Sequence, residues 1–401
     1  MHTGIVRLTA ICLFSTGVGF AEEVSFSRDV MAVLSKAGCN GGACHGNQNG
    51  KGGFKLSLWG ENPGEDFKAL HSRGRVNTGD PTASKLLLKP TLQLKHEGKK
   101  RFGTDSVEYR ILLDWIRSGA KEDTDNAPRL ESLSVSPKAA ILTAPENSLA
   151  LKVTAAFSDG SKRDVTRWAV YETSSLIAET NPAGIAEFVQ PGETTVFVRY
   201  LSGRASMRAG MIRPRTDFRW SGPAPANVID THVFAKLKQF RENPAEPCDD
   251  ATFIRRVFLD ITGSLPNPSE AQNFVENPNP GKRSLLIDRL LASPEYAAFW
   301  ALKWADLLRV EEKTLDAKGV ETFHNWIRES LATGKPLDTF AREVLSSTGS
   351  TYENPPSNFY RALRVPVDRA EAAAQVFLGS RLKCARCHDH PFEDVRQDDY
   401  Y

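Results

Sequence analysis

The chain has 401 residues, of which 51 are Lys or Arg and 49 are Asp or Glu, and its formal net charge is +2. This balance gives no support for a nucleic-acid partner, and the sequence contains no helix-turn-helix, phosphate loop or nuclease motif. With 40% hydrophobic residues, a chain of this length suits about three globular domains.

The first segment, residues 1–21, is typical of a secretory signal. Its charged region ends at Arg7, an apolar run continues to Phe20, and the small residues Gly19 and Ala21 precede a predicted cleavage after Ala21. The apolar run is too short to span a bilayer, and no later segment approaches the roughly 20 apolar residues that a transmembrane helix needs. We therefore expect an exported chain, periplasmic or extracellular, without a transmembrane segment.

Residues 22–125 are predicted to be helical at both ends. Ser27 is the expected N-cap of a first helix that Gly38 ends, directly before Cys39. A second helix is predicted in "DSVEYRILLDWIRSGA", which ends at Gly119. A short helix before a Cys-Cys-His stretch, with a closing helix later, is the layout of an all-α cytochrome-c-like domain, although many helical domains would share it.

The stretch "KAGCNGGACHGNQNGKGG" nearly spells a c-type haem attachment motif, but four residues instead of two separate Cys39 from the Cys44-His45 pair. One hypothesis is covalent haem, with both thiols attached and His45 as the axial ligand. We expect Gly41 and Gly42 to absorb the extra length through conformations that other residues avoid. The alternative is a disulfide that closes a small loop, as is common in exported proteins.

A haem in this domain needs a sixth ligand, and methionine or histidine is the usual choice. Met31 lies on the helix that enters the motif and is expected in the core, and His71 is a weaker candidate. His96 lies in an irregular stretch before the closing helix, where a loop should pass over the haem. We predict that His45 and His96 form the axial pair. The alternative is a surface His96 in a basic loop.

From residues 128–214 the hydrophobic period changes to two, which predicts an all-β sandwich. The segment "SLALKVTAAFSDGSKRDVT" alternates apolar and polar residues and should turn at Asp159-Gly160. Its part "VTAAFSDGSKRDVT", with Trp168 after it, resembles bacterial group 2 immunoglobulin-like (Ig-like) domains. The resemblance implies a spacer or adhesive unit, with contact to a cell surface or polymer as a further expectation.

A Pro-rich linker is predicted at residues 215–227, and residues 228–401 are predicted to form a second all-α region. Aromatic side chains recur there at helical spacing, and we expect them chiefly in the core; they are Phe299, Trp300, Trp304 and Trp326. Cys248, before one of these helices, is predicted to have no functional role.

The segment "RLKCARCHDHPFE" has Cys384, Cys387 and His388 at the spacing of c-type haem attachment. Thiols three positions apart can reach both vinyl groups of one porphyrin edge, and the next residue can place its imidazole under the iron. A redox dithiol or half of a zinc site would need partners that the sequence lacks, and a structural disulfide is the other alternative. His390 is too close to His388 to reach the opposite face, so we expect an exposed second haem with an open or weakly filled sixth position.

The chain as a whole resembles large secreted planctomycete-type proteins in which a cytochrome-c-like domain, a group 2 Ig-like domain and a helical domain of unknown function follow one another. The resemblance rests on "KAGCNGGACHGNQNGKGGFKLSLWG", "DPTASKLLLKP", "HEGKKRF", "FIRRVFLDITGSLP", "LLASPEYAAFWALKWADLLR" and "FLGSRLKCARCHDHPFEDVRQDDYY". It implies haem c and electron transfer but no substrate. It also implies that members continue beyond the position of Tyr401, so that this chain is truncated at its C-terminus.

The expected function is therefore that of an exported c-type cytochrome that binds one or two covalent haems and passes electrons to an unknown redox partner. The expected iron ligands are His45, His96 and His388. One alternative is a haem-dependent peroxidase or oxidoreductase that uses an open second haem. Another is a haem-free, disulfide-stapled binding or scaffold protein, so the sequence leaves open whether the chain is an enzyme.

Overall fold

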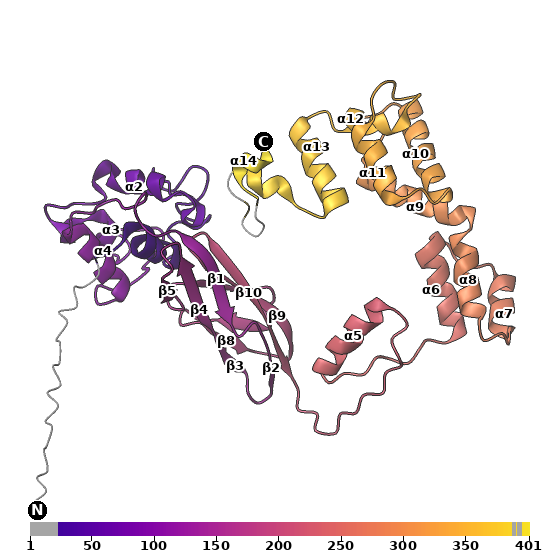
Figure 1. Ribbon diagram of the computed structural model, residues 1–401, viewed down its shortest axis with the longest axis horizontal. Coiled ribbons are helices and arrows are strands. Elements are labelled where there is room, and N and C mark those ends of the chain that lie inside the picture. The colour runs from indigo at the N-terminus through magenta and orange to yellow at the C-terminus, as the bar shows by residue number, and fades with distance from the viewer. Residues whose placement is uncertain (1–22, 387–389, 391–394) are drawn as a thin grey trace, which may run out of the picture. The chain divides into compact units, whose positions relative to one another are not determined.

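The computed structural model describes residues 23–386, 390 and 395–401 (Figure 1). The predicted signal at residues 1–21 and the predicted haem ligands Cys387 and His388 therefore lie outside the described residues. The chain divides into two compact units, residues 1–218 with 239–241, and residues 219–238 with 242–401. No helix within the described residues combines the length and the apolar character needed to cross a bilayer.

The first part of unit 1 is helical, as predicted. Ser25, and not Ser27, caps the first helix by accepting a hydrogen bond from the Arg28 N–H, while the Ser27 hydroxyl donates to Asp123. Ser106 caps the closing helix, where its side chain accepts a hydrogen bond from the Tyr109 N–H. The elements are η1 (Phe26–Val30), α1 (Met31–Lys36), η2 (Leu58–Gly60), α2 (Pro63–His71), η3 (Ser72–Gly74), η4 (Pro81–Ala83), α3 (Lys85–Leu88) and α4 (Val107–Arg117).

These helices share one hydrophobic core. Met31 is fully buried there, which confirms its expected place in the core and removes it as a candidate ligand. Trp115 of α4 packs beside Phe26 of η1, with ring centroids 5.3 Å apart. The long gap between α3 and α4 contains the irregular stretch with His96, which is therefore held at its two ends by buried helices.

The second part of unit 1 is a β region, as predicted. Its sheets have the strand orders β1-β4-β5, β2-β10-β9-β6 and β3-β8-β7, and β2 runs parallel to β10 while the other pairs are antiparallel. Gly160, at φ +80°, makes the predicted turn between β4 and β5. The strands are β1 (Leu130–Ser136), β2 (Ala139–Thr143), β3 (Ser148–Ala150), β4 (Lys152–Phe157), β5 (Lys162–Asp164), β6 (Val170–Thr173), β7 (Ala178–Thr180), β8 (Ile185–Phe188), β9 (Gly192–Tyr200) and β10 (Gly203–Ile212).

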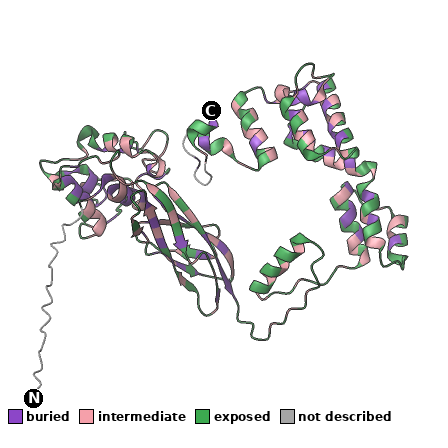
Figure 2. Cartoon of the chain, in the orientation of Figure 1, coloured by how far each residue is buried: buried purple, intermediate pink, exposed green. Residues whose placement is uncertain are grey.

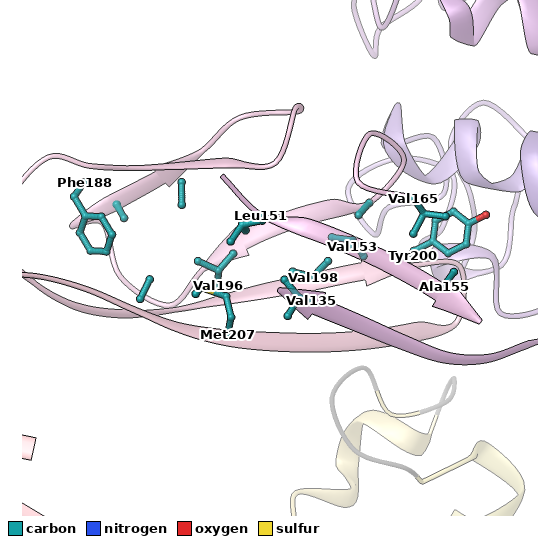
Figure 3. Packing of buried hydrophobic residues seen from close by; sticks show 14 of the residues in the cluster. Val135, Leu151, Val153, Ala155, Val165, Phe188, Val196, Val198, Tyr200 and Met207 are labelled. Atoms are coloured by element: carbon teal, nitrogen blue, oxygen red, sulfur yellow. The ribbon is translucent and has the colours of Figure 1, made fainter. Parts of the chain in front are cut away.

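Alternate residues of these strands fill one core between the sheets, as period-two patterning requires. Figure 3 shows Val135 of β1, Val153 of β4, Val198 of β9 and Met207 of β10 directed into it. Met207 is almost fully buried in this core.

The helical part and the β region of unit 1 pack directly on each other. The Tyr200 hydroxyl donates to the Arg28 carbonyl at 3.1 Å, and Arg163 pairs with Asp29 at 3.4 Å. The Lys36 ammonium, at the end of α1, donates to the Ala169 carbonyl at 2.5 Å. The β region is therefore a direct support of the helix that leads to Cys39.

Unit 2 is helical, as predicted, and Figure 2 shows buried and exposed residues on the same helices. One core surrounds Phe323 and Phe340, and a second surrounds Phe258 and Phe274. Its elements are α5 (Val228–Gln239), α6 (Asp250–Thr262), α7 (Pro268–Glu276), α8 (Lys282–Leu291), α9 (Pro294–Leu307), α10 (Ala317–Ala332), α11 (Leu337–Ser346), η5 (Pro355–Ser357), α12 (Asn358–Ala362), α13 (Pro366–Ala373), η6 (Ala374–Leu378), η7 (Leu382–Arg386) and α14 (Gln397–Tyr400).

The prediction that four aromatic side chains lie in the core holds for two of them. Trp304 and Trp326 pack on Phe340, with centroids 5.0 and 4.8 Å away. Phe299 and Trp300 are only half-buried and lie outside both cores, and the Lys303 ammonium lies 4.7 and 5.5 Å from their ring centroids.

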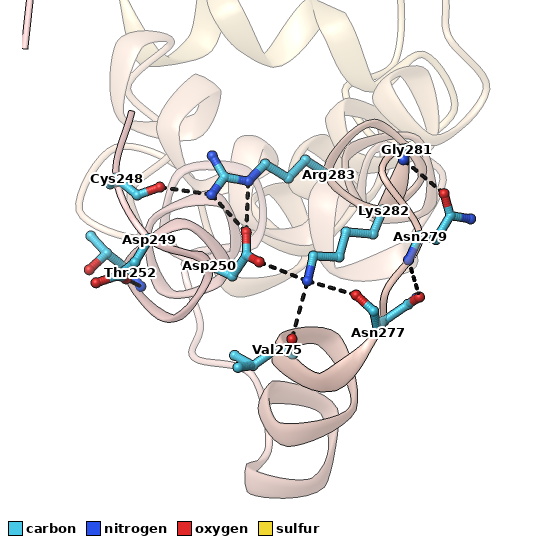
Figure 4. Close-up of polar contacts among 10 residues, drawn as sticks. All are labelled: Cys248, Asp249, Asp250, Thr252, Val275, Asn277, Asn279, Gly281, Lys282 and Arg283. Atoms are coloured by element: carbon cyan, nitrogen blue, oxygen red, sulfur yellow. Dashed lines mark hydrogen bonds and ion pairs between the residues drawn. The ribbon is translucent and has the colours of Figure 1, made fainter. Parts of the chain in front are cut away.

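A polar clasp joins the starts of α6 and α8 (Figure 4). Asp250 accepts from Lys282 and from Arg283, each at 2.7 Å, and these bonds hold the pKa of its carboxyl below the usual range. The Arg283 guanidinium also reaches the Cys248 carbonyl at 2.7 Å. The backbone of Cys248 thus serves this clasp, while its thiol is free.

Candidate functional site around His45 and His96

A pocket of about 680 Å³ in the helical part of unit 1 gathers the predicted ligands of the first haem. Two hollows of unit 2, beside α11–α12 and between α6 and α7, contain neither cysteine nor histidine. The pocket of unit 1 is lined by Leu34, Cys39, Cys44, His45, Lys51, Gly52, Phe54, Arg73, Arg75, Lys85, Leu86, Lys89, Pro90, Lys95, His96, Glu97, Gly98 and Arg101.

A tight turn places both cysteines on this pocket. Gly38, at φ +72°, ends α1, and the Cys39 N–H donates back to the Leu34 carbonyl at 2.8 Å. The turn then closes on itself, because the His45 N–H donates to the Cys39 carbonyl at 3.0 Å. Backbone hydrogen bonds thus fold the four residues between the two cysteines into a closed turn.

The expected role of Gly41 and Gly42 is wrong, since neither is among the glycines with positive φ. The glycine that the turn requires is Gly46, where a Cβ would lie 2.0 Å from the Asn40 carbonyl oxygen. The sequence suggested a glycine-dependent turn but not the position on which it depends. Close approach of two backbone segments, and not an unusual dihedral angle, selects glycine there.

The His45 imidazole is held by its Nδ1 atom, which lies 3.0 Å from the Phe54 carbonyl and 3.1 Å from the Lys51 carbonyl. Carbonyl oxygens only accept, so this nitrogen carries the hydrogen and Nε2 keeps its lone pair. Burial lowers the pKa of His45, which favours the neutral ring. A neutral imidazole with a fixed tautomer is the form that binds a metal ion.

His96 is held in the same way, with its Nδ1 atom 3.0 Å from the Lys99 carbonyl. The Lys99 N–H donates back to the His96 carbonyl at 3.1 Å, so a short turn fixes the ring. Its Nε2 atom is therefore also the nitrogen with a free lone pair.

The rings of His45 and His96 lie with centroids 6.4 Å apart and planes inclined by 16°. Two imidazole nitrogens that each bind one metal ion at about 2 Å place their ring centroids roughly 6 Å apart. The two rings are therefore spaced as a pair of ligands on opposite sides of one ion. Both rings line the same pocket, and their pairing on one iron stays a prediction.

Within the described residues no group of three or more Cys, His, Asp or Glu side chains is arranged to hold a metal ion. Two histidines alone do not complete the tetrahedral site that zinc prefers. Two imidazoles would suffice for an iron whose remaining ligands come from a porphyrin. The donor set therefore fits haem better than a bare ion.

Cys39 and Cys44 are both free thiols. Cys39 packs against the helical core, and burial raises the pKa of its thiol to about 12. The Cys44 sulfur accepts from the Arg101 guanidinium at 3.3 Å. The disulfide alternative is thus not formed in this structure, and both sulfurs border the pocket that holds the two histidines.

Two contacts that support His45 were not anticipated from the sequence. The centroid of the Phe54 ring lies 4.6 Å from that of the His45 ring, and the Arg75 guanidinium carbon lies 4.3 Å from the Phe54 centroid. His71, the weaker candidate ligand, instead packs on Phe67 at 4.1 Å and is not part of the pocket lining. The only sequence signal for Phe54 was its place as the first large apolar residue after the glycine-rich stretch.

The second predicted site is described only in part. Cys384 is exposed on η7, and Cys387 and His388 lie outside the described residues. His390 is buried, and its backbone N–H donates to the Val395 carbonyl at 2.8 Å. Haem attachment at this site stays a prediction.

Residues 228–401 match the model of a family described as PSCyt2, protein of unknown function (DUF1549). No curated protein matches the chain. The PSCyt2 match covers the helical unit that contains Cys384, and it agrees with the expected helical domain of unknown function. The family description names no activity, so a proposed function has to rest on the geometry of the pocket around His45 and His96.

Proposed function

We propose that the chain is an exported c-type cytochrome that binds one or two covalent haems and transfers electrons. The observation that carries this proposal is the pair of near-parallel rings of His45 and His96, 6.4 Å apart, beside two free thiols on the same pocket. Export is proposed from the N-terminal signal pattern.

The residues of the pocket have separate tasks in this proposal. Cys39 and Cys44 would attach the porphyrin, and His45 and His96 would bind its iron. When bound, haem supplies an iron that changes its charge by one electron. The carbonyls that accept from each Nδ1 atom fix the tautomers and increase the basicity of both rings.

The apolar part of the lining consists of Leu34, Phe54, Leu86 and Pro90. Two imidazoles that bind one iron would leave no open position for a substrate. That arrangement supports electron transfer at the first site in preference to catalysis.

For the rest of the chain we propose a cytochrome-c-like fold for residues 22–125, a group 2 Ig-like fold for residues 128–214, and a second haem at Cys384, Cys387 and His388. The β region packs directly on the helical part, which supports a role as a fixed mount for the first haem. Exposure of Cys384 supports a second haem that is open to solvent.

The test is expression of the secreted chain in a host with a c-type haem attachment system, followed by a pyridine haemochrome assay and intact-mass measurement. We expect covalent haem, and we expect Cys39→Ala with Cys44→Ala to remove the mass of one haem. The matched control is Cys248→Ala, which should leave the mass of attached haem unchanged. A wild-type chain that carries no haem would refute the proposal.

A further inference from the structure

The mouth of the His45–His96 pocket is strongly basic. Its lining contains one acidic side chain, Glu97, and seven basic ones, which are Lys51, Arg73, Arg75, Lys85, Lys89, Lys95 and Arg101. The whole chain, in contrast, has 51 basic and 49 acidic residues. Positive charge is thus concentrated at this place, and we call these seven residues the basic rim.

Most of the basic rim is available to a partner. Arg75 is the exception, since it is half-buried and donates to Ser72 and to the Gly53 carbonyl. The other six are exposed. In the described part of the chain none of these six forms an ion pair. A bound haem brings two propionates, which are too few to neutralise six cations.

Two exposed leucines lie next to the basic rim. Leu92 is 49% exposed and Leu94 is 41% exposed, between the rim residues Lys89 and Lys95. Leu92 adopts φ +62°, which is uncommon for a leucine. Exposed leucines in a strained turn indicate a surface that contacts something apolar.

This turn is ordered by its own backbone. The Arg101 N–H donates to the Pro90 carbonyl at 2.8 Å, and the Leu94 N–H donates to the Leu88 carbonyl at 3.0 Å. The leucines are therefore held at the surface by a fixed loop, next to the loop residue that contributes His96.

Exposed apolar side chains beside charges of one sign occur together in protein–protein interfaces. A small anion would use the cations but not the leucines. An acidic membrane surface usually binds an amphipathic helix with aromatic side chains, whereas this patch is a loop that has leucines and no aromatic residue.

We propose that the basic rim, with Leu92 and Leu94, is the docking face for a soluble acidic electron-transfer protein. Its redox character rests on the proposed function, whereas the docking itself rests on the charges and the leucines. Long-range attraction to the rim speeds the encounter, and the leucines hold the partner once it has docked.

The experiment measures binding of the full secreted chain to an acidic plant-type two-iron ferredoxin, with an acidic flavodoxin as a second probe. Raising the ionic strength from about 0.01 M to about 0.15 M shortens the screening length from about 30 Å to about 8 Å. We expect the association rate to fall about tenfold or more over this range.

The test variant is Lys85→Gln, Lys89→Gln and Lys95→Gln together, which should lower the association rate about tenfold at low ionic strength. The control has the same change of net charge on exposed lysines of the β region, Lys138→Gln, Lys152→Gln and Lys162→Gln. It should change the rate less than about twofold. Equal effects of the two triple variants would overturn the proposal.

A second variant, Leu92→Asn with Leu94→Ser, changes exposed side chains, and asparagine accepts the conformation of Leu92. We expect the dissociation rate to rise about tenfold while the association rate is kept. An unchanged dissociation rate would remove the apolar part of the proposal.

Three results would refute an acidic protein as the partner: no salt-sensitive binding to either carrier, binding to phosphatidylserine vesicles alone, or complete competition by inorganic phosphate. Haem content is measured in each sample. A chain that lacks haem but still docks through the rim would refute the proposed function and leave the docking face in place. A haem-loaded chain that fails to dock would refute the docking face and leave the proposed function in place.

Discussion

The guanidinium carbon of Arg199 lies 3.6 Å from the centroid of the Trp59 ring, so a residue of β9 stacks on a residue of η2. Trp59 has φ +57° and its N–H donates to the Asn40 carbonyl at 3.0 Å. Its ring also touches Gly41, inside the turn between Cys39 and Cys44. The β region therefore reaches the cysteine turn through one stacked pair.

This contact predicts that Arg199→Ala loosens the cysteine turn. The side chain of Arg199 is only 13% exposed, and its stacking on Trp59 should contribute about 1–2 kcal/mol to the free energy of unfolding. The loss is measured by chemical denaturation of the full chain, in the unfolding transition of residues 23–218. In the haem-loaded chain the electron paramagnetic resonance spectrum should broaden, because the position of His45 becomes less uniform.

Arg204→Ala is the matched control, since Arg204 is exposed on the neighbouring strand and faces Arg199 in the ladder. Arg199→Lys keeps the charge but loses the planar stacking, and we expect an intermediate loss of stability. Equal stability of the two alanine variants would show that the Trp59 contact contributes nothing.

His96→Ala should remove one axial ligand of the first haem while both thioether bonds persist. We expect the absorption spectrum to change from the low-spin to the high-spin form, and added imidazole to reverse the change. His71→Ala is the control, because His71 packs on Phe67 away from the pocket. A low-spin spectrum in His96→Ala without added imidazole would mean that another residue is the sixth ligand.

Much of the helical and β architecture was predictable from the sequence because it follows hydrophobic period. The turn at Gly160 is set by neighbours within a few residues, and this prediction is confirmed. The cap at Ser27 is wrong since its hydroxyl is used by Asp123, 96 residues away. A local sequence pattern cannot reveal a hydrogen-bond partner that lies so far away along the chain.

In the candidate site too, features set by neighbouring residues were predictable and contacts between distant residues were not. Cys39, Cys44 and His45 lie within seven residues of one another, and His96 was selected from its place in an irregular stretch before a helix. The contact of Arg199 with Trp59 joins residues of two separate predicted domains, so no periodicity or motif could reveal it. Only packing of the two parts brings that pair together.

Cys39 should react slowly with iodoacetamide in the haem-free chain. Its thiol has a pKa of about 12, because burial disfavours the thiolate that reacts. We expect the exposed Cys384 to be alkylated about 100-fold faster at pH 8, as measured by peptide mass spectrometry. In denaturant the two rates should converge. Rapid alkylation of Cys39 in the folded chain would contradict its burial.

The buried carboxyl of Asp66 should make the stability of the segment that follows His45 depend on pH. This carboxyl is 1% exposed and accepts from the Ser57 N–H at 2.5 Å and the Ser57 hydroxyl at 2.6 Å. Burial raises its pKa from 3.8 to about 6, although both bonds from Ser57 oppose the shift. Ser57 follows Leu56, whose N–H donates to the His45 carbonyl at 2.8 Å.

Between pH 4 and pH 6 the folded chain therefore keeps a proton on Asp66 that the unfolded chain has lost. The free energy of unfolding should fall as the pH rises through this window, by at most about 3 kcal/mol. Asp66→Asn cannot ionise, so its unfolding free energy should lack this component of the decline. The measurement is urea denaturation at pH 4, 5, 6 and 7 (about 1-unit steps) for both chains. Parallel curves for the wild type and Asp66→Asn would show that Asp66 is ionised throughout, with Ser57 and not burial setting its charge.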